Sequence, residues 1–538
     1  MKRFWTAIPV LLAAVATCGG SGSGVLGSPV TTYSIERQEA SVYRTEATPR
    51  SATATERDRA LCRLIESESE SAGRRLGGDG RLDELASWVM ENLNQDGTPP
   101  PFEALDFAAR HFGLPEPAPH LFVAGVSGGD SLEQQLKQKI SEIMARQDYT
   151  HYGLAYREID GTAFLAIAFS WRWFQMSKAA RGLPANAVIR LKGRLTSGHR
   201  NPSIALTKPD NTTLQQTGGK GPSFDLSIMA DQIGTYRLEL LAQGQHGATV
   251  LANFPIYVGV PIPRRIDIAG TDSARQGEGD SDFVPRLHGL INQTRAQHGL
   301  EPLDLDAELS EVALAHCIDM DRNGFIGHDS PQTGTAADRA KKAGIQSPIV
   351  LENIGRGYSA REVHSGLMQS PAHRANILSR EVTHVGIGLV KQDEGSKPAY
   401  LVTQVFIRVV ADIDLGKAPD ELLDLINDAR ASRGLDEVAS DDMLSEYARQ
   451  AALSYFARPD LSDKMLAKRI NQRLGKTADR FRQVATLLKL ADSLERIKEV
   501  SQLFDPEITT VGIGIAQGTK EGEMPNAIII VLIMAWQR

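Results

Sequence analysis

A duplicated segment in the second half of the chain constrains the fold more than any other feature. Residues 290–300 (LINQTRAQHGL) recur 135 positions later as residues 425–435 (LINDARASRGL). A Val-Gly-Ile-Gly run at residues 385–388 returns at residues 511–514. A repeat of this length indicates a duplicated domain, because solenoid units are only about 20–50 residues long.

A weaker third copy lies nearer the amino terminus. Residues 150–155 (THYGLA) resemble residues 383–388 (THVGIG). We therefore expect copies at residues 57–173, 279–410 and 415–538. The chain of 538 residues has room for about three to four domains, which agrees with three copies and one further domain.

The local patterns of the central copy predict an α+β fold. Leu287, Leu290, Ile291 and Thr294 follow the spacing of one face of an amphipathic helix. Asp306 can cap a second helix that carries Leu309, Ala313, Cys317 and Met320, and Ser370-Pro371 can begin another. Residues 384–390 and 400–408 are strand-like, with a turn between them.

Residues 174–262 have a different pattern, of short β-runs separated by turns. Gly234-Thr235-Tyr236-Arg237-Leu238 resembles the tyrosine corner of an immunoglobulin-like sandwich. We therefore expect an all-β Ig-like sandwich here. Residues 263–278, with Gly270, Gly277 and scattered charges, are expected to be a linker.

The amino terminus resembles a secretory signal. Lys2 and Arg3 precede a short apolar run, and Val15-Ala16-Thr17-Cys18 resembles a lipobox that would make Cys18 the lipidated first residue. Ordinary cleavage after Ala14-Val15-Ala16 is the alternative. We expect residues 1–18 to be the signal, residues 19–56 to be a disordered tether, and the protein to be a secreted or extracytoplasmic lipoprotein of the outer membrane or periplasm.

The composition argues against a nucleic-acid-binding protein and against a disulfide-rich fold. A net charge of −7 and a pI of about 6.0 give no general attraction to nucleic acid. Three cysteines cannot supply a disulfide framework for a chain of this length. Cys62 and Cys317 both fall on expected helices, and either a disulfide between them or two free thiols fits the sequence.

Five ordered motifs in the central copy carry a family resemblance. They are FIGHDSP at residues 325–331, ENI at 352–354, SPAHRANIL at 370–378, VGIG at 385–388 and TQVF at 403–406. The central copy resembles the CAP superfamily, the cysteine-rich secretory, antigen 5 and pathogenesis-related-1 proteins. The resemblance implies an α-β-α sandwich with a His/Glu cluster in a central groove. The flanking copies resemble the family only through the repeat and are expected to be degenerate.

The resemblance carries over only part of the family's cluster. His328 and Glu352 match its first His and first Glu, whereas Ser370 lies near the position of the second Glu. The family's second His is absent from residues 401–404 (LVTQ), and His373 of the bacterial block stands in for it. A metal site, with zinc as the possible ion, would then require His328 and His373 to converge.

The expected groove residues are drawn from these motifs. They are His328, Glu352, His373, Ser330, Asn353, Arg374 and Gln404. Arg374, near the start of a helix, could pair with a carboxylate. A hydrogen bond between His328 and Glu352 that only closes a loop is the structural alternative. His316, His364 and His384 fall in periodic helix or strand patterns and are interpreted as scaffold or surface histidines.

Three functions remain open. The leading one is a groove that binds a lipid or other small apolar ligand, a peptide or an extracellular partner protein. The second is a His/Glu or metal-assisted extracellular hydrolase, and the third is a structural envelope scaffold. Residues 125–129 (GVSGG) fit a nucleophile elbow. The repeat instead aligns Ala124 with Glu352, so this segment is interpreted as a degenerate copy of the family loop.

Overall fold

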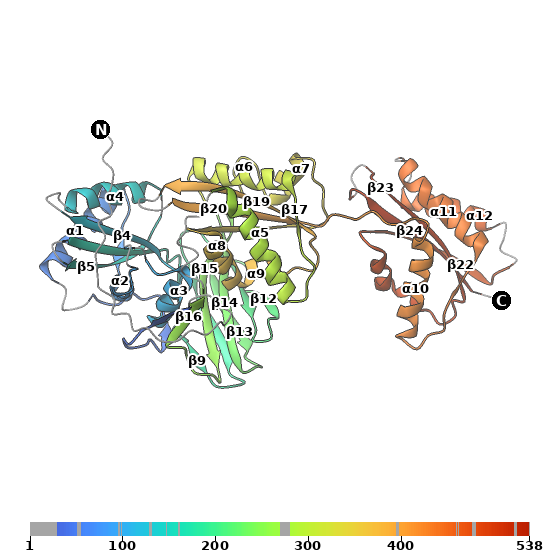
Figure 1. The fold of residues 1–538 in the computed structure, drawn as a ribbon. Coiled ribbons are helices and arrows are strands. Elements are labelled where there is room, and N and C mark those ends of the chain that lie inside the picture. Colours follow the sequence, from blue (N-terminus) through green and yellow to red (C-terminus); the bar gives the residue numbers. More distant parts are fainter. Residues whose placement is uncertain are drawn as a thin grey trace, which may run out of the picture. The chain divides into compact units, whose positions relative to one another are not determined.

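The computed structural model describes most of the chain and divides it into two compact units. One unit contains residues up to 343 together with 351–380 and 385–406, and the other contains 344–350, 381–384 and 407–538. Figure 1 shows the helices and strands of both. The described residues are 30–50, 55–94, 97, 99–127, 132–146, 148–159, 162–269, 280–393, 398–458, 460, 462–475, 480–520 and 524–536.

Three open four-stranded sheets share one strand order, in which a two-residue strand is followed by a long hairpin and an edge strand. The first sheet is β3 (Gly77–Gly78), β5 (His151–Ile159), β6 (Thr162–Ser170) and β4 (His120–Ser127). The central sheet is β17 (Asp304–Leu305), β19 (His384–Asp393), β20 (Pro398–Ile407) and β18 (Val350–Gly357). The last sheet is β21 (Ala439–Ser440), β23 (Thr510–Gly518), β24 (Ala527–Trp536) and β22 (Gln483–Ala491).

Helices cover these sheets, which confirms the α+β class (Figure 1). The first set is α1 (Glu56–Ser71), α2 (Gly80–Glu91), α3 (Phe102–His111) and α4 (Leu132–Arg146). The central set is α5 (Asp280–Gln297), α6 (Ala307–Asn323), α7 (Ala336–Lys342), α8 (Ala360–Gln369) and α9 (Pro371–Ile377). The last set is α10 (Ala418–Ala431), α11 (Asp442–Ala457), α12 (Asp463–Leu474) and the 3₁₀ helices η1 (Leu494–Glu499) and η2 (Ser501–Phe504).

The strands β6 and β24 each separate two apolar cores. Along β24 every residue is buried, and alternate side chains enter opposite cores: Ile530 packs with α10, and Val531 packs with α11 and α12. Along β6, Ile167 packs with α1 and α4, and Ala168 packs with α2 and α3. A strand buried on both faces explains the continuous apolar run of residues 528–534.

Helix boundaries in the central domain follow the expected capping signals. The side chain of Asp306 accepts a hydrogen bond from the Leu309 N–H at the start of α6, and Gly324 ends that helix with φ of 68°. Ser370 caps α9, whose first residue is Pro371. These caps confirm the predicted starts of both helices.

The repeated Val-Gly-Ile-Gly run brings a helix into contact with the sheet backbone. A Cβ placed on Gly388 would lie 2.0 Å from the Leu314 N of α6. A Cβ placed on Gly514 would lie 2.0 Å from the Ala448 carbonyl carbon of α11. Only glycine permits this approach, so the motif is retained for packing rather than for chemistry.

Side-chain contacts also recur between the central and last domains. Asn292 Oδ1 accepts the Leu303 N–H at 2.8 Å, and Asn427 Oδ1 accepts the Val438 N–H at 2.9 Å. Each asparagine also donates to the carbonyl of the same residue. The repeated sequence therefore makes the same local structure twice.

Residues 174–258 form two antiparallel sheets around one apolar core. One sheet has the order β13 (Ser223–Met229), β10 (Val188–Leu195) and β7 (Phe174–Met176). The other has the order β12 (Thr213–Thr217), β11 (Arg200–Thr207), β14 (Gly234–Gly244), β15 (Gly247–Val258) and β9 (Gly182–Leu183), of which β9 is parallel to β15. Alternate residues such as Leu191 and Leu240 fill the core between the sheets. The Tyr236 hydroxyl accepts the Gln232 N–H at 2.7 Å.

The structure corrects the expected tether and linker. β1 (Val30–Ser34), within the expected tether 19–56, pairs with β16 (Arg265–Ala269), within the expected linker 263–278. β2 (Val42–Tyr43) pairs with β8 (Ala179–Ala180). Tyr33 and Tyr43 are buried. The burial of these aromatic rings offsets the conformational entropy that the segment loses when it becomes ordered. The disordered-tether interpretation is therefore wrong for residues 30–50, and residues 19–29 and Cys18 lie outside the described part.

The two described cysteines are free thiols. Cys317 Sγ donates to Thr403 Oγ1 at 3.1 Å, and burial raises the pKa of this thiol to about 11. Cys317 is therefore a packed core residue with little thiolate at neutral pH. Within the described ranges, the helices include none with the length and apolarity needed to cross a bilayer.

Replacing Gly388 with alanine is expected to lower the free energy of unfolding by at least about 2 kcal/mol, because the new methyl group meets the backbone of α6. Urea unfolding of the full chain measures the change. Gly289→Ala is the control, since its Cβ meets nothing within 4 Å on the exposed face of α5. Equal stability of Gly388→Ala and this control would contradict the close-contact account.

Candidate functional site

The loop between α6 and α7 carries His328 and is braced by its own side chains. Ser330 Oγ donates to Asp319 Oδ2 of α6 at 2.5 Å, and it accepts the backbone N–H groups of Gln332 and Thr333. The backbones of Ser330 and Gly334 exchange two hydrogen bonds. Ser330 therefore shapes the loop.

The carboxylate of Glu352, on the edge strand β18, is the centre of the site. His328 Nδ1 lies 2.9 Å from Oε1, and Arg339 donates to Oε2 at 2.5 Å. His316 Nε2 lies 4.0 Å from Oε1. The carboxylate thus lies between one permanent cation and two imidazole rings.

The charges around Glu352 compensate for its burial. Burial disfavours the ionised form, but the hydrogen bond to His328 and the charge of Arg339 hold the pKa of Glu352 below its usual value. Burial lowers the pKa of His316, which keeps this ring neutral. His316 Nε2 is 2.9 Å from the Gly327 carbonyl oxygen and donates to it, so this ring also anchors the His328 loop.

Asn353 connects the site to the neighbouring elements. Its side chain is fully buried and donates to Gln404 Oε1 of β20 at 3.1 Å and to the His373 carbonyl at 3.2 Å. Asn376 of α9 donates to Asn353 Oδ1 at 2.9 Å and to the Glu352 carbonyl at 3.1 Å. The structure thus brings together His328, Glu352, Asn353, Gln404 and the backbone of His373.

The imidazole of His373 shares the electrostatic environment of His328. Burial, followed by the positive charge that His328 can carry, lowers the pKa of His373 to about 3. His373 is therefore neutral at physiological pH. Its side chain makes no hydrogen bond to any residue in the described ranges.

Arg374 does not join this cluster. Its guanidinium donates to Asn211 Oδ1 and to His298 Nε2, both at 2.9 Å. The expected pairing of Arg374 with a carboxylate is therefore wrong. The helix α9 presents His373 and Arg374 in different directions, as it must for consecutive helical residues.

These residues do not fit a zinc site. Both oxygens of Glu352 are occupied, and the guanidinium of Arg339 would repel a cation. Within the described part of the chain, no three His, Cys, Asp or Glu side chains are arranged to hold a metal ion. A structural or catalytic zinc ion takes at least three protein ligands, which His328 and His373 alone cannot supply.

The β14–β15 hairpin of the sandwich packs against the His328 loop. The His246 carbonyl accepts the Asp329 N–H at 3.1 Å, and the His246 ring stacks on Phe325 with 4.6 Å between centroids. A Cβ on Gly327 would lie 2.4 Å from the His246 oxygen, so the Gly-His-Asp motif needs its glycine here.

A second contact from the sandwich fixes α9. The buried carboxylate of Glu239 on β14 accepts the Ser370 hydroxyl at 2.6 Å and the Ala372 N–H at 3.0 Å. Burial raises the pKa of Glu239 to about 7, against the opposing effect of these two donors. Both segments that carry the site's histidines are therefore held by the sandwich.

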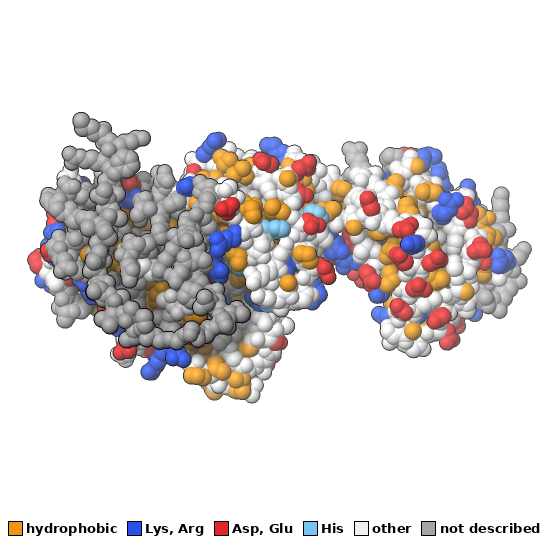
Figure 2. Space-filling view, viewed as in Figure 1, with side chains coloured by type: hydrophobic (Ala, Val, Ile, Leu, Met, Phe, Trp, Pro, Cys, Tyr) orange, Lys and Arg blue, Asp and Glu red, His pale blue; other side chains and the backbone are white. Residues whose placement is uncertain are grey.

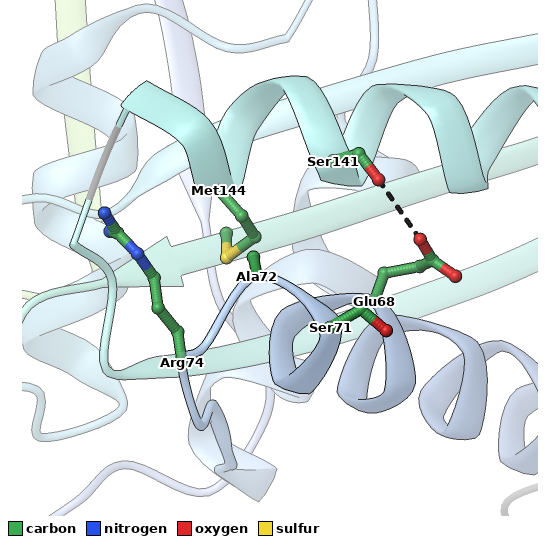
Figure 3. A pocket seen from close by; sticks show the side chains of 6 residues that line it. All are labelled: Glu68, Ser71, Ala72, Arg74, Ser141 and Met144. Carbon is green, nitrogen blue, oxygen red and sulfur yellow. Dashed lines mark hydrogen bonds between the residues drawn. The ribbon is translucent and has the colours of Figure 1, made fainter.

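A hollow lies away from this site, between α1 and α4. Its volume is about 500 Å³, and its lining includes Glu68, Arg74, Ser141 and Met144 (Figure 3). Ser141 donates to Glu68 and Lys137 pairs with Glu68, so the carboxylate already has partners. The carboxylate of this hollow therefore gives less reason to expect a ligand than the Glu352 cluster does.

Comparison with known proteins places the central copy in a known domain family. Residues 288–406 match the model of the cysteine-rich secretory protein (CAP) family. The central domain is a CAP domain. The CAP domain is 39% identical over 112 residues to the uncharacterized protein YkwD of Bacillus subtilis, a match that covers 21% of this chain and 44% of YkwD. The uncharacterized membrane protein YlbC of the same organism is 33% identical over 101 residues, 19% of this chain and 29% of YlbC.

The match with each of these curated relatives spans less than half of that relative's length. Among solved structures, an extracellular SCP-domain protein from Bacillus anthracis has 20% identity and a TM-score of 0.21, covering 33% of this chain and 65% of that one. An outer surface protein from Borrelia burgdorferi has 20% identity and a TM-score of 0.22, covering 24% of this chain and 97% of that one.

Sequence reasoning missed three residues of the CAP site. Arg339 lies outside the motifs, although the Thr335–Asp338 capping box places it at the start of a helix beside the His328 loop. His316 was assigned to scaffold, yet it contacts the loop and faces Glu352. Glu239 comes from another domain, and no local pattern could connect it to Ser370.

Replacing Arg339 with methionine is expected to cost about 3–5 kcal/mol of unfolding free energy, because Glu352 would keep a buried charge without its cation. The folded pKa of Glu352 lies below its unfolded value of about 4.3, so the pair stabilises above that pH and loses its effect as pH falls through the folded pKa. Urea unfolding at neutral and acidic pH measures both effects.

The exposed Lys341 of the same helix provides the control, and Lys341→Met should change stability by less than about 0.5 kcal/mol. Arg339→Met combined with Glu352→Gln should recover part of the loss, since the uncompensated charge is gone. An Arg339→Met protein as stable as the control would show that Arg339 does not neutralise Glu352.

Proposed function

We propose that this chain is an extracytoplasmic binding protein that recognises its ligand at the His328–Glu352 site. The main support is that the three hydrogen-bonded side chains of this cluster differ in their solvent exposure. The His328 side chain is 28% exposed, whereas those of Glu352 and Arg339 are 4% and 5% exposed. Glu352 orients His328 through Nδ1, so Nε2 is available to a ligand at the surface.

Binding is favoured over hydrolysis by the groups around His328. The Ser330 hydroxyl donates to Asp319, and the Cys317 thiol is buried against Thr403. Neither is directed to His328 as an activated nucleophile would be. The carboxylate of Glu352 is occupied by Arg339 and His328, which suits an orienting group.

The neighbouring surface supports an apolar ligand with a polar end. Ile326, two residues before His328, is 48% exposed, and Phe325 packs below it against His246. A lipid or an apolar peptide could place its chain on Ile326 and a hydrogen-bonding group on His328. A partner protein could present the same chemistry from an extended segment.

A hydrolase is the second candidate, and one observation favours it. A histidine that is paired through Nδ1 to a carboxylate and has a free Nε2 has the orientation of a general base. Such an enzyme would need to activate water directly, because neither the Ser330 hydroxyl nor the Cys317 thiol is aligned with His328.

We further propose that the three sheet domains are copies of the CAP fold and that residues 174–262 are an Ig-like sandwich. The shared strand order and the recurring asparagine contacts support duplication. The first copy has Ala124 at the aligned position of Glu352, and the third has no histidine. These two copies then serve as scaffold or interface.

The amino terminus supports an envelope location. A signal at residues 1–18 would bring the chain across the membrane, and lipidation of Cys18 would anchor it there. The extracellular or outer-surface description of two structural neighbours is consistent with this location.

His328→Ala is expected to weaken ligand binding by at least about tenfold, the effect of losing one or two hydrogen bonds. Native mass spectrometry of protein purified from the envelope identifies a bound ligand, and titration with that ligand compares variants. Glu352→Gln should weaken binding less, because the amide oxygen can still accept from Nδ1.

Lys341→Ala is the control, since it lies on α7 outside the cluster and should bind as the parent protein does. Unchanged affinity in His328→Ala would reject this site for binding. Hydrolysis of added peptide or peptidoglycan that is lost in His328→Ala would instead support the enzyme.

A further inference from the structure

The end of the sandwich that lies away from the β14–β15 hairpin bears an exposed apolar patch. Val188, Met229 and Ile233 are 50%, 56% and 64% exposed. Val188 and Met229 are directly paired on β10 and β13. Hydrophobic side chains gather at the lower end of the sandwich in Figure 2. Clustered apolar exposure of this kind marks an interaction site more often than isolated residues do.

The patch lies on two strand ends, at Val188 and Met229, and on the turn that carries Ile233, and hydrogen bonds hold these segments in place. The Asn186 N–H donates to the Ala230 carbonyl at 3.1 Å, and the Ala230 N–H donates to the Ala187 carbonyl at 2.9 Å, which joins two loops. The Tyr236 hydroxyl fixes the turn before Ile233 by bonding Gln232. Ile233 in turn lies next to Gly259 at the start of a third loop.

A cationic hollow adjoins the apolar tips. It has a volume of about 790 Å³ and is lined by Pro261, Ile262, Pro263, Arg264, Arg265 and Glu39. Arg264 is 82% exposed. Glu39 pairs with the buried Arg181 at 2.8 Å through Oε1 and lies 3.9 Å from Arg264 Nε through Oε2, so the one carboxylate of the lining is outnumbered by Arg264 and Arg265. The hollow therefore presents cations to solvent beside an apolar surface.

We infer that this end of the sandwich docks onto an anionic lipid surface, with the three apolar side chains entering the interface and Arg264 and Arg265 contacting headgroup phosphates. Projecting apolar tips beside exposed arginines match the layers of a bilayer, in which the apolar region lies beneath the phosphates. A flat protein interface would instead favour a broad apolar face.

The position of Val30, where the described part of the chain begins, fits a lipid surface as the partner of this patch. β1 starts at Val30, paired with Ala269 on the strand that follows the cationic hollow. Residues 19–29 can span at most about 40 Å. An anchor at Cys18 would thus keep the patch within reach of the membrane. The strand β14 extends about 35 Å from the patch to the hairpin at the CAP site.

Vesicle flotation of the full chain carrying Cys18→Ser tests the inference without any contribution from a lipid anchor. The parent protein is expected to float with vesicles that contain phosphatidylglycerol. Val188→Ser combined with Met229→Ser and Ile233→Ser should weaken flotation by about tenfold or more. Leu453→Ser with Met465→Ser, similarly exposed at 48% and 47%, is the matched control and should float as the parent does.

Arg264→Ser with Arg265→Ser should remove the preference for phosphatidylglycerol over phosphatidylcholine vesicles. A triple apolar variant that is folded by circular dichroism and floats like the parent would overturn the inference. A parent that does not float would overturn it too. If that parent self-associates and the triple variant is monomeric in ultracentrifugation, the patch is a protein interface and the lipid inference is wrong. None of these outcomes depends on ligand binding at His328.

Discussion

The buried charge of Glu352 is the interaction on which the CAP site depends. A carboxylate taken out of water is stable only when it is paired and hydrogen-bonded, and this one is paired with Arg339 and bonded to His328. Arg339 also donates to the carbonyls of His328 and Gly334, so one guanidinium binds both the carboxylate and the loop. The same contacts that neutralise Glu352 therefore position His328 at the surface.

The sandwich is part of this arrangement. His246 packs on the loop before His328, and Glu239 holds the segment before His373. The first unit is consequently built around contacts between its domains, and the geometry of the site belongs to that unit rather than to the CAP domain alone. The β14–β15 hairpin of the sandwich thus packs on the His328 loop, and the strand ends away from this hairpin carry exposed apolar residues.

Local patterns and motifs predicted much of the central domain. The caps at Asp306 and Ser370 and the His328–Glu352 contact all follow from short sequence signals. The missed contacts join residues that are far apart in the chain, such as Glu239 and Ser370 at a separation of 131 residues. β1 was misassigned for the same reason, because its partner β16 lies about 235 residues away. Sequence periodicity reports which residues are buried, but it does not report which distant residues they meet.

The protonation of the His328 ring tests the central claim most directly. If Glu352 orients His328, two-dimensional ¹⁵N NMR of the neutral ring should show the proton on Nδ1 and a free Nε2. Glu352→Leu should abolish this preference, because a free imidazole favours the other tautomer. A proton on Nε2 in the parent protein would contradict the account, since Glu352 would then not hold the ring with Nε2 free for a ligand.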